Sequence, residues 1–406
     1  SPMPSRLRHL GNRDALGALV LTASFPLLFL HERFQPEYGV GLGSTTVDVR
    51  ISDVALLVVF VIAVVSALRH GVDRLAPGRA LWLAGAALLA WMAFATLRPA
   101  STGDALFDEN LVSFLKLGEY ALLALAVPLL VRRAEDLTIL LGGLVLWCAV
   151  ATGVAVLQFL GLDVFAASSA GWRYPSFLGR HDLAALAVLS TSIASAGLIA
   201  GRRHMPCRPL FAVALIGGVG GLVLAGSVAA AGGLAVGAVA LALAGRRRFK
   251  PSGRQLLALA AVVFVVSSGV VVVRSAALDD FLQFVGIRQD DSVVGVETYS
   301  QRTVLAYIGL RIWQDNPVVG VGWQRSSRPE VFEPYIADAR ERFPDVVDLA
   351  FPAEGREWGV QNLYIQMLAD AGVIGLLLLL AVGAAGLVLA WRTVTYAANP
   401  WAAGAG

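Results

Sequence analysis

The stretch LYIQMLADAGVIGLLLLLAVGAAGLVLAW, residues 363–391, is an apolar run long enough to cross a lipid bilayer. A membrane-spanning helix needs about 20 predominantly apolar residues, and this run exceeds that length. The rest of the chain has the same character, because 57% of its 406 residues are hydrophobic, only 15% are charged, and the mean hydropathy is +0.70. A water-soluble domain could not bury so large an apolar fraction. The sequence therefore predicts a polytopic membrane protein.

Further apolar runs of similar length predict an all-α fold of about ten transmembrane helices. The expected spans lie near residues 14–31, 52–68, 79–97, 111–131, 137–160, 182–201, 209–226, 228–244, 255–273 and 363–391. The first run, Ala15–Leu30, lacks a clear small-residue cleavage site, so we expect a spanning helix there and not a signal peptide. The predicted organisation is a bundle of nine spans in residues 1–273, an extracytoplasmic loop over 274–360, and a final span with a cytoplasmic tail over 361–406.

Basic residues cluster in alternate loops, which predicts the orientation of the chain. Lys and Arg are enriched in cytoplasmic loops, and the loops that begin at Arg69, Arg132, Arg202 and Arg246 form one basic side. The other side carries few arginines: Arg33, Arg50, Arg98, Arg173 and Arg180. We therefore expect both termini in the cytoplasm, the protein in the cytoplasmic (inner) membrane, and the loop over 274–360 outside. The net charge of +3 is too small to indicate nucleic-acid binding.

The sequence offers little support for a metal, a cofactor or a disulfide. It contains no Asp-x-Asp, no Walker loop and no G-x-S-x-G, which disfavours metal-dependent transfer, ATP-driven transport and a serine hydrolase. The pairs Asp279-Asp280 and Asp290-Asp291 lie in a loop and stay open as cation ligands. The two cysteines, in an apolar run and in a basic loop, are not expected to pair. We expect no cofactor and no metal.

Small residues dominate GGVGGLVLAGSVAAAGGLAVGAVALALAG, residues 217–245. Such composition lets helices approach closely, and we favour packing over a substrate path for this segment.

The long loop is predicted to be an ordered cap, because it is rich in aromatic residues and contains an amphipathic helix from Ser300 to Gln314. Arg302 and Arg311 are nine residues apart, which places them on opposite faces of that helix. Two interpretations stand equal here. The arginines either bind an anionic ligand or reach to lipid headgroups.

Two other polar groups stand at or within predicted spans. GWRYPSFLGRHDL, residues 171–183, gathers Arg173, Arg180 and His181 at the entrance of a span, where they either bind phosphate or anchor the helix in the interface. FLKLGEY, residues 114–120, places Lys116 and Glu119 on one helix face, close enough to pair. An intramembrane ion pair is a functional candidate, although a structural pair is favoured.

Several motifs together resemble the O-antigen ligase and O-antigen polymerase family of membrane glycosyltransferases. Arg302 is followed by Trp313, by NPVVGVG (316–322), by QNLY (361–364) and by DAGVIG (370–375). Those proteins show R…P…GVG, then HN-x-Y-L and E-x-G-x-x-G, and the segments 173–183 and TTVDVRISDVALL (45–57) are also similar to the family pattern. The resemblance implies a lipid-dependent glycosyltransferase (GT-C-like) fold, a polyprenyl-diphosphate-linked glycan donor, a glycan or lipid acceptor, and an active site on the outer face of the membrane.

The resemblance also implies roles for particular residues. Arginines would neutralise the departing diphosphate without a metal, and inversion at the anomeric carbon is expected. The residues that match these roles are, for the diphosphate, Arg173, Arg180, Arg302 and Arg311; for the acceptor side, Glu357, Gln361 and Asn362; and as further candidates, Lys116, Arg98, His181, Tyr364 and Asp370.

Two positions depart from the family pattern. The family histidine of HN is matched by Gln361, which cannot take a proton, and an S-R pair is matched by Ser227-Val228. Either other residues fill these roles, or the match is locally shifted, or the chain is a divergent or inactive member. For the base we look first to Glu357, four residues before Gln361 and one turn away if the helix starts early, and second to Glu354.

Three functions are weighed on these grounds. The first is glycan transfer to an acceptor hydroxyl. The second is a transporter or flippase of a polar lipid, which predicts an internal repeat that the sequence does not show. The third is a catalytically silent scaffold of a cell-envelope assembly.

Overall fold

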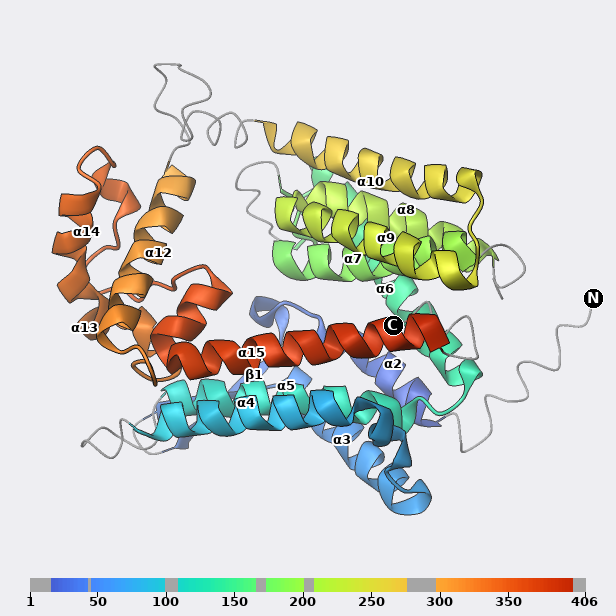
Figure 1. Cartoon of the computed structure of the whole chain (residues 1–406), viewed down its shortest axis with the longest axis horizontal. Helices are drawn as coiled ribbons and strands as arrows, with labels where there is room; N and C mark the ends of the chain where they lie inside the picture. The colour runs from blue at the N-terminus through green and yellow to red at the C-terminus, as the bar shows by residue number, and fades with distance from the viewer. Residues whose placement is uncertain are drawn as a thin grey trace, which may run out of the picture.

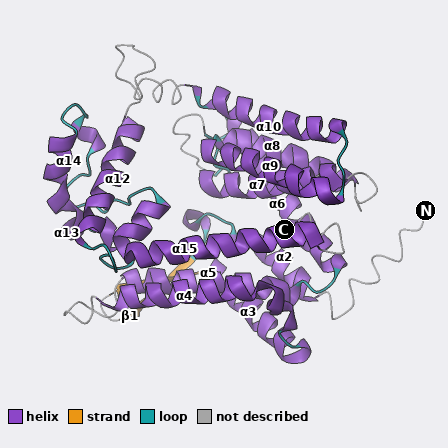
Figure 2. Ribbon diagram, viewed as in Figure 1, coloured by secondary structure: helices purple, strands orange, loops and turns teal. Residues whose placement is uncertain are grey.

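The computed structural model describes residues 16–42, 45–98, 109–165, 173–200, 208–275 and 297–396. Within these ranges the chain is almost entirely helical, and a short pair of strands is the exception (Figure 2). The helices are α2 (Leu16–Leu28), α3 (Ile51–His70), α4 (Arg79–Leu97), α5 (Glu109–Leu130), α6 (Ala134–Phe159), α7 (Arg180–Ala200), α8 (Arg208–Ala225), α9 (Val228–Arg248), α10 (Gly253–Val273), α12 (Glu297–Asp315), α13 (Pro329–Phe332), α14 (Ile336–Arg342) and α15 (Leu363–Tyr396).

Among the described residues, nine helices are long and apolar enough to cross a membrane, which confirms the predicted polytopic all-α fold. They are α3 to α10 and α15. The expected first span corresponds to α2, whose described part has 13 residues and falls short of the crossing length of about 20.

The long helices run roughly along one direction, and α12, α13 and α14 lie together at one end of them (Figure 1). Helices α7 to α10 form one group, and α15 runs along α4 across the middle of the molecule. We call the end with α12 to α14 the cap end. Because successive helices alternate in direction, the end of α2 and the start of α7 lie at the cap end, whereas the start of α2 and the end of α3 lie at the opposite end.

The main core is built where α2, α3 and α5 to α10 meet, and small residues bring α8 close to its neighbours. A side chain at Gly218 would lie 2.3 Å from the hydroxyl of Thr191, and Thr152 donates a 2.8 Å hydrogen bond to the carbonyl of Gly217. By contrast, a side chain at Gly232 or Gly237 of α9 would meet no atom within 4 Å. The glycines of α8 therefore allow close helix packing, as expected. Gly232 and Gly237 of α9 make no close contact with another helix.

Two strands that the sequence did not suggest precede α3. Strands β1 (Glu37–Leu42) and β2 (Thr45–Arg50) form an antiparallel pair. Lys116 of α5 donates to the carbonyl oxygen of Asp48 at 2.8 Å and lies 3.3 Å from the carboxylate of Asp53 in α3. The described residues hold no ion pair between Lys116 and Glu119, so the pairing suggested by the sequence is replaced by one that attaches the hairpin and α3 to α5.

The cap, residues 297–360, has a hydrophobic core of its own. Val304, Ile308 and Ile312 of α12 pack against a set of cap residues: Phe332, Ala339 and Phe351. This confirms the amphipathic helix expected over residues 300–314. The two Asp pairs at residues 279–280 and 290–291, which the sequence left open as cation ligands, lie outside the described residues.

Polar contacts hold the cap helices together at the surface. Arg311 donates to Asp338 at 2.8 Å, and the Tyr335 hydroxyl donates to Asp315 at 2.7 Å. Burial, together with the Asp315 carboxylate, raises the pKa of Tyr335 to about 12, so the hydroxyl stays protonated and donating at neutral pH.

Candidate active site

A basic pocket of about 310 Å³ opens at the cap end, between the segment after α2 and the start of α7. It is lined by His31, Arg33, Arg173, Pro175, Gly179, Arg180, His181 and Asp182. The structure thus brings together Arg173, Arg180 and His181, which the sequence named as one group. Three arginines and two histidines face a single carboxylate, so the pocket is suited to an anion.

A buried glutamine fixes the backbone that forms one wall of the pocket. Gln158, in the last turns of α6, accepts a 2.8 Å hydrogen bond from the backbone N–H of Ser176 and donates to the carbonyl oxygens of Ser176 and Val164. Ser176 adopts a positive φ of 58°, which is uncommon outside glycine. The amide of Tyr174 donates to the carbonyl of Leu224 in α8. The turn that carries Arg173 is therefore held from two helices.

His31 reaches the pocket from another part of the chain. Its backbone N–H donates to the carbonyl of Phe177 at 3.1 Å, and its ring lies against Gly179. A side chain at Gly179 would lie 2.8 Å from the ring of His31, and φ at this glycine is +90°. Gly179 therefore serves both the turn and the close approach of the histidine. The Nδ1 atom of His31 accepts a 3.3 Å hydrogen bond from the backbone N–H of Arg33.

One more arginine stands beside the pocket. Gly226, between α8 and α9, has φ +58°, and a side chain there would lie 3.4 Å from Cγ of Arg173 and 3.4 Å from Cδ of Arg274. The stems of these two arginines therefore flank one glycine. The Nε atom of Arg274 is buried and has no hydrogen-bond partner. Arg274, His31 and Arg33 were not candidates from the sequence, because each stands in a different segment from residues 173–183.

The other arginines proposed for the diphosphate lie on α12 in the cap and do not line this pocket. Arg302 is exposed. Arg311 donates to Asp338 and to Gln314, so its contacts hold the cap together.

The start of α15 holds the residues proposed for the acceptor side. Asn362 caps the helix, because its side-chain oxygen accepts from the N–H groups of Tyr364 and Ile365 at 3.1 and 3.2 Å. Gln361 is exposed and has φ +55°, and Tyr364 is also exposed. Glu357 is exposed. Since α15 begins at Leu363, Glu357 and Gln361 do not share a helical turn, and the helical spacing argument for Glu357 is wrong.

A break inside α15 explains the two glycine motifs. Gly372 has φ 67° and ψ −170°, which interrupts the helix. The loop of residues 317–322 supplies the hydrogen bonds that the break leaves open. Val321 N–H donates to the carbonyl of Ala369, and Val373 N–H donates to the carbonyl of Pro317, both at 2.9 Å. The loop over 317–322 therefore replaces part of the helix ladder.

Gly320 and Gly372 are both required at this contact, because any Cβ atom there would clash with the opposite backbone. A side chain at Gly372 would lie 2.1 Å from the carbonyl oxygen of Val318, and one at Gly320 would lie 2.3 Å from the carbonyl carbon of Asp370. Arg98, at the end of α4, donates to the carbonyl of Gly320 at 2.6 Å. The motifs that carried the resemblance thus form one backbone contact between the cap and α15.

Asp370 faces into this contact. Its side chain is fully buried, and its two oxygens accept from the N–H groups of Gln324 and Ser326, both at 3.0 Å. These bonds hold the turn after the GVG sequence. The hydrogen bonds of Arg98 and Asp370 therefore hold the cap in place. The hydrogen bond of Lys116 attaches the β1–β2 hairpin to α5.

Residues 211–380 match the family model described as O-antigen ligase. The chain carries an O-antigen ligase domain. This match includes the cap, the glycine contact, Arg274 and the first part of α15, whereas the segment 173–182 precedes it. The family that this model describes is one of glycosyltransferase-like membrane enzymes that act on lipid-linked glycans. A comparison with curated proteins gave no match. In the described part of this chain, no group of three or more His, Cys, Asp or Glu side chains is placed to hold a metal.

Proposed function

We propose that this protein transfers a glycan from a polyprenyl-diphosphate-linked donor to an acceptor hydroxyl, of a sugar or a lipid, at the outer face of the cytoplasmic membrane. The observation that carries the proposal is the basic pocket lined by Arg173 and Arg180, which stands at the cap end where spans begin and end. A polyprenyl tail can lie in the bilayer beside these helices while its diphosphate enters the pocket. The basic-loop distribution supports the outer location of this end.

The chemistry explains why arginines suit this site. The leaving group is a lipid diphosphate whose negative charge grows as the bond to the sugar breaks. Arg173 and Arg180 can donate paired hydrogen bonds to the phosphate oxygens and remain charged throughout. Arg274, beside Arg173, adds a further positive charge. Stabilisation is then stronger in the transition state than in the ground state, which is what accelerates the reaction.

The bonds balance as a single displacement. The acceptor oxygen forms a bond to the anomeric carbon from the face opposite the diphosphate, the bond from that carbon to the phosphate oxygen breaks, and its electron pair leaves with the diphosphate. The configuration at the anomeric carbon inverts. The acceptor hydroxyl must lose its proton, and Gln361 cannot take it. We propose Glu357 as the base, because it is an exposed carboxylate in the segment that leads to Gln361, independent of any shared helical turn.

Paired variants test the pocket assignment. The double variant R173A/R180A should lower transfer of a lipid-linked glycan to acceptor by about 100-fold or more, since each charge-assisted hydrogen bond contributes about 1.5–3 kcal/mol. The control R254A removes an exposed arginine at the start of α10, at the opposite end, and should transfer normally. Full activity of the double variant would overturn the assignment.

The same preparation separates the other two functions. Wild-type protein that moves labelled lipid across liposomes without forming product would favour a flippase. Wild-type protein that binds the donor and never consumes it would favour a silent scaffold. Both outcomes contradict transfer.

A further inference from the structure

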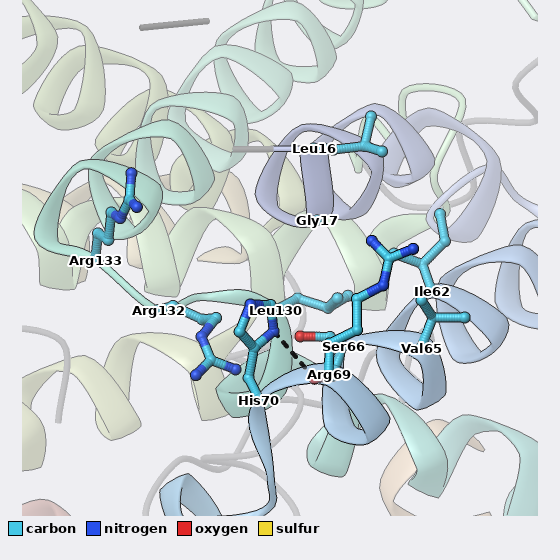
Figure 3. A pocket seen from close by; sticks show the side chains of 10 residues that line it. All are labelled: Leu16, Gly17, Ile62, Val65, Ser66, Arg69, His70, Leu130, Arg132 and Arg133. Carbon is cyan, nitrogen blue, oxygen red and sulfur yellow. Dashed lines mark hydrogen bonds between the residues drawn. The ribbon is translucent and has the colours of Figure 1, made fainter. Parts of the chain in front are cut away.

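A second basic cavity lies at the opposite end of the bundle, far along the helices from the active-site pocket. It has a volume of about 520 Å³ and forms where α2 begins, α3 ends and α5 passes into α6. Figure 3 shows the residues that line it: Leu16, Gly17, Ile62, Val65, Ser66, Arg69, His70, Leu130, Arg132 and Arg133. Glycan transfer as proposed above makes no use of this cavity.

Two of the cavity's arginines, Arg69 and Arg132, carry charges that no described carboxylate neutralises in an ion pair. Arg69 and Arg132 form no ion pair with any described residue, and Nη1 of Arg132 is buried without a hydrogen-bond partner. Asp136 in the first turn of α6 accepts from the backbone N–H groups of Arg132 and Arg133 at 2.9 and 2.8 Å, so its carboxylate serves the helix start.

The side chains are arranged around an opening. In Figure 3 the guanidinium groups of Arg69 and Arg132 lie on opposite sides, the ring of His70 lies between them, and Arg133 extends away. The Nδ1 atom of His70 lies 3.2 Å from the carbonyl oxygen of Ser66, and the Ser66 hydroxyl donates to the carbonyl of Leu129 at 2.9 Å. These hydrogen bonds connect α3 to α5. They do not involve the guanidinium groups of Arg69 and Arg132, which can bind a ligand.

The remaining lining is apolar and comes from residues within the helices. Ile62 and Val65 lie on α3 one to two turns before Arg69, and Leu16 and Leu130 are the terminal residues of α2 and α5 at this end of the bundle. A cavity that combines arginines at the ends of spanning helices with apolar side chains of those helices matches a membrane lipid with a charged headgroup and acyl chains. A free anion would satisfy the rim alone.

We propose that this cavity binds the headgroup of an anionic membrane phospholipid. Arg69 and Arg132 contact the phosphate from two sides, and an acyl chain lies along Ile62 and Val65. Residues 1–15, which precede Leu16, contain three arginines and one aspartate and so add net positive charge to this part of the chain. The bound lipid would join α3 to the α5–α6 connection.

Native mass spectrometry of the purified full chain, with phosphatidylglycerol or phosphatidylcholine added in detergent, tests the proposal. Wild-type protein should retain phosphatidylglycerol in preference to phosphatidylcholine. The double variant R69Q/R132Q should bind phosphatidylglycerol about 10-fold more weakly or worse, because two charge-assisted hydrogen bonds are lost. R254A, an exposed arginine outside the cavity, should bind as wild type does.

Two further measurements distinguish loss of charge from loss of fold, and a lipid from a free anion. R69K/R132K retains both charges and should recover part of the binding, which separates loss of charge from loss of fold. Inorganic phosphate at the same concentration should not displace the lipid. Equal binding by R69Q/R132Q and wild type, equal retention of phosphatidylcholine, or displacement by inorganic phosphate would each overturn the proposal.

Discussion

At the scale of single residues, the sequence predicts the grouping of some side chains of the site and not of others. Arg173, Arg180 and His181 lie in one short stretch, so their grouping could be predicted from the chain alone. His31 and Arg274 reach the same place from distant loops, and only the packing of Gly179 and Gly226 shows it. The distribution of loop arginines does predict which residues lie on the same side of the membrane. It does not predict which of them lie close together.

The proposed base can be tested at one position. E357Q keeps the size of the side chain and removes its ability to take a proton, so kcat should fall by about 10²–10⁴ while KM for the donor changes little. The matched control is E341Q, an exposed glutamate of α14, which should transfer glycan normally. Steady-state transfer kinetics give both constants. An unchanged kcat in E357Q would remove Glu357 from the mechanism.

At the scale of elements, hydropathy was sufficient for the spanning helices and the cap helix, because both depend on local composition and period. The break in α15 could not be predicted in this way. Residues 363–391 read as one uninterrupted apolar run, whereas the break depends on a distant loop that supplies hydrogen bonds to Ala369 and Asp370. The hairpin β1–β2 and the contacts of Lys116 were missed for the same reason.

The contact between the cap and α15 predicts a difference between two glycines of one helix. G372A forces a residue with a side chain to φ 67°, which costs about 1–2 kcal/mol, and places Cβ against the backbone of Val318. We expect a clear loss of thermal stability in detergent, measured by intrinsic tryptophan fluorescence. G383A, where an added side chain meets no atom within 4 Å, should unfold at or slightly above the wild-type temperature. Similar melting temperatures for the two variants would contradict the contact.

At the scale of the whole molecule, two basic cavities lie at the two ends of one helical bundle. The cap-end pocket is attributed to the diphosphate of the donor, and the opposite cavity to an anionic phospholipid. Their assignment to the two leaflets depends on the orientation predicted from the loop arginines.

The orientation is measurable by labelling single cysteines. In a background in which Cys148 and Cys207 are replaced by alanine, E341C in the cap should react in intact cells with a maleimide that cannot cross the membrane, after the outer membrane is permeabilised where one is present. R254C, at the start of α10, should react only after the cytoplasmic membrane is opened, because it is predicted to be cytoplasmic. The reverse pattern would place the active-site pocket inside the cell.

The central claim is that the pocket lined by Arg173 and Arg180 holds the diphosphate of the donor, and binding of a polyprenyl diphosphate to purified protein tests it most directly. Wild-type protein should bind the diphosphate more tightly than the matching monophosphate, and R173A/R180A should weaken diphosphate binding by at least about 10-fold while R254A does not. Binding measured by isothermal titration in detergent micelles would give these affinities. Equal affinity of R173A/R180A and wild type for the diphosphate would contradict the claim.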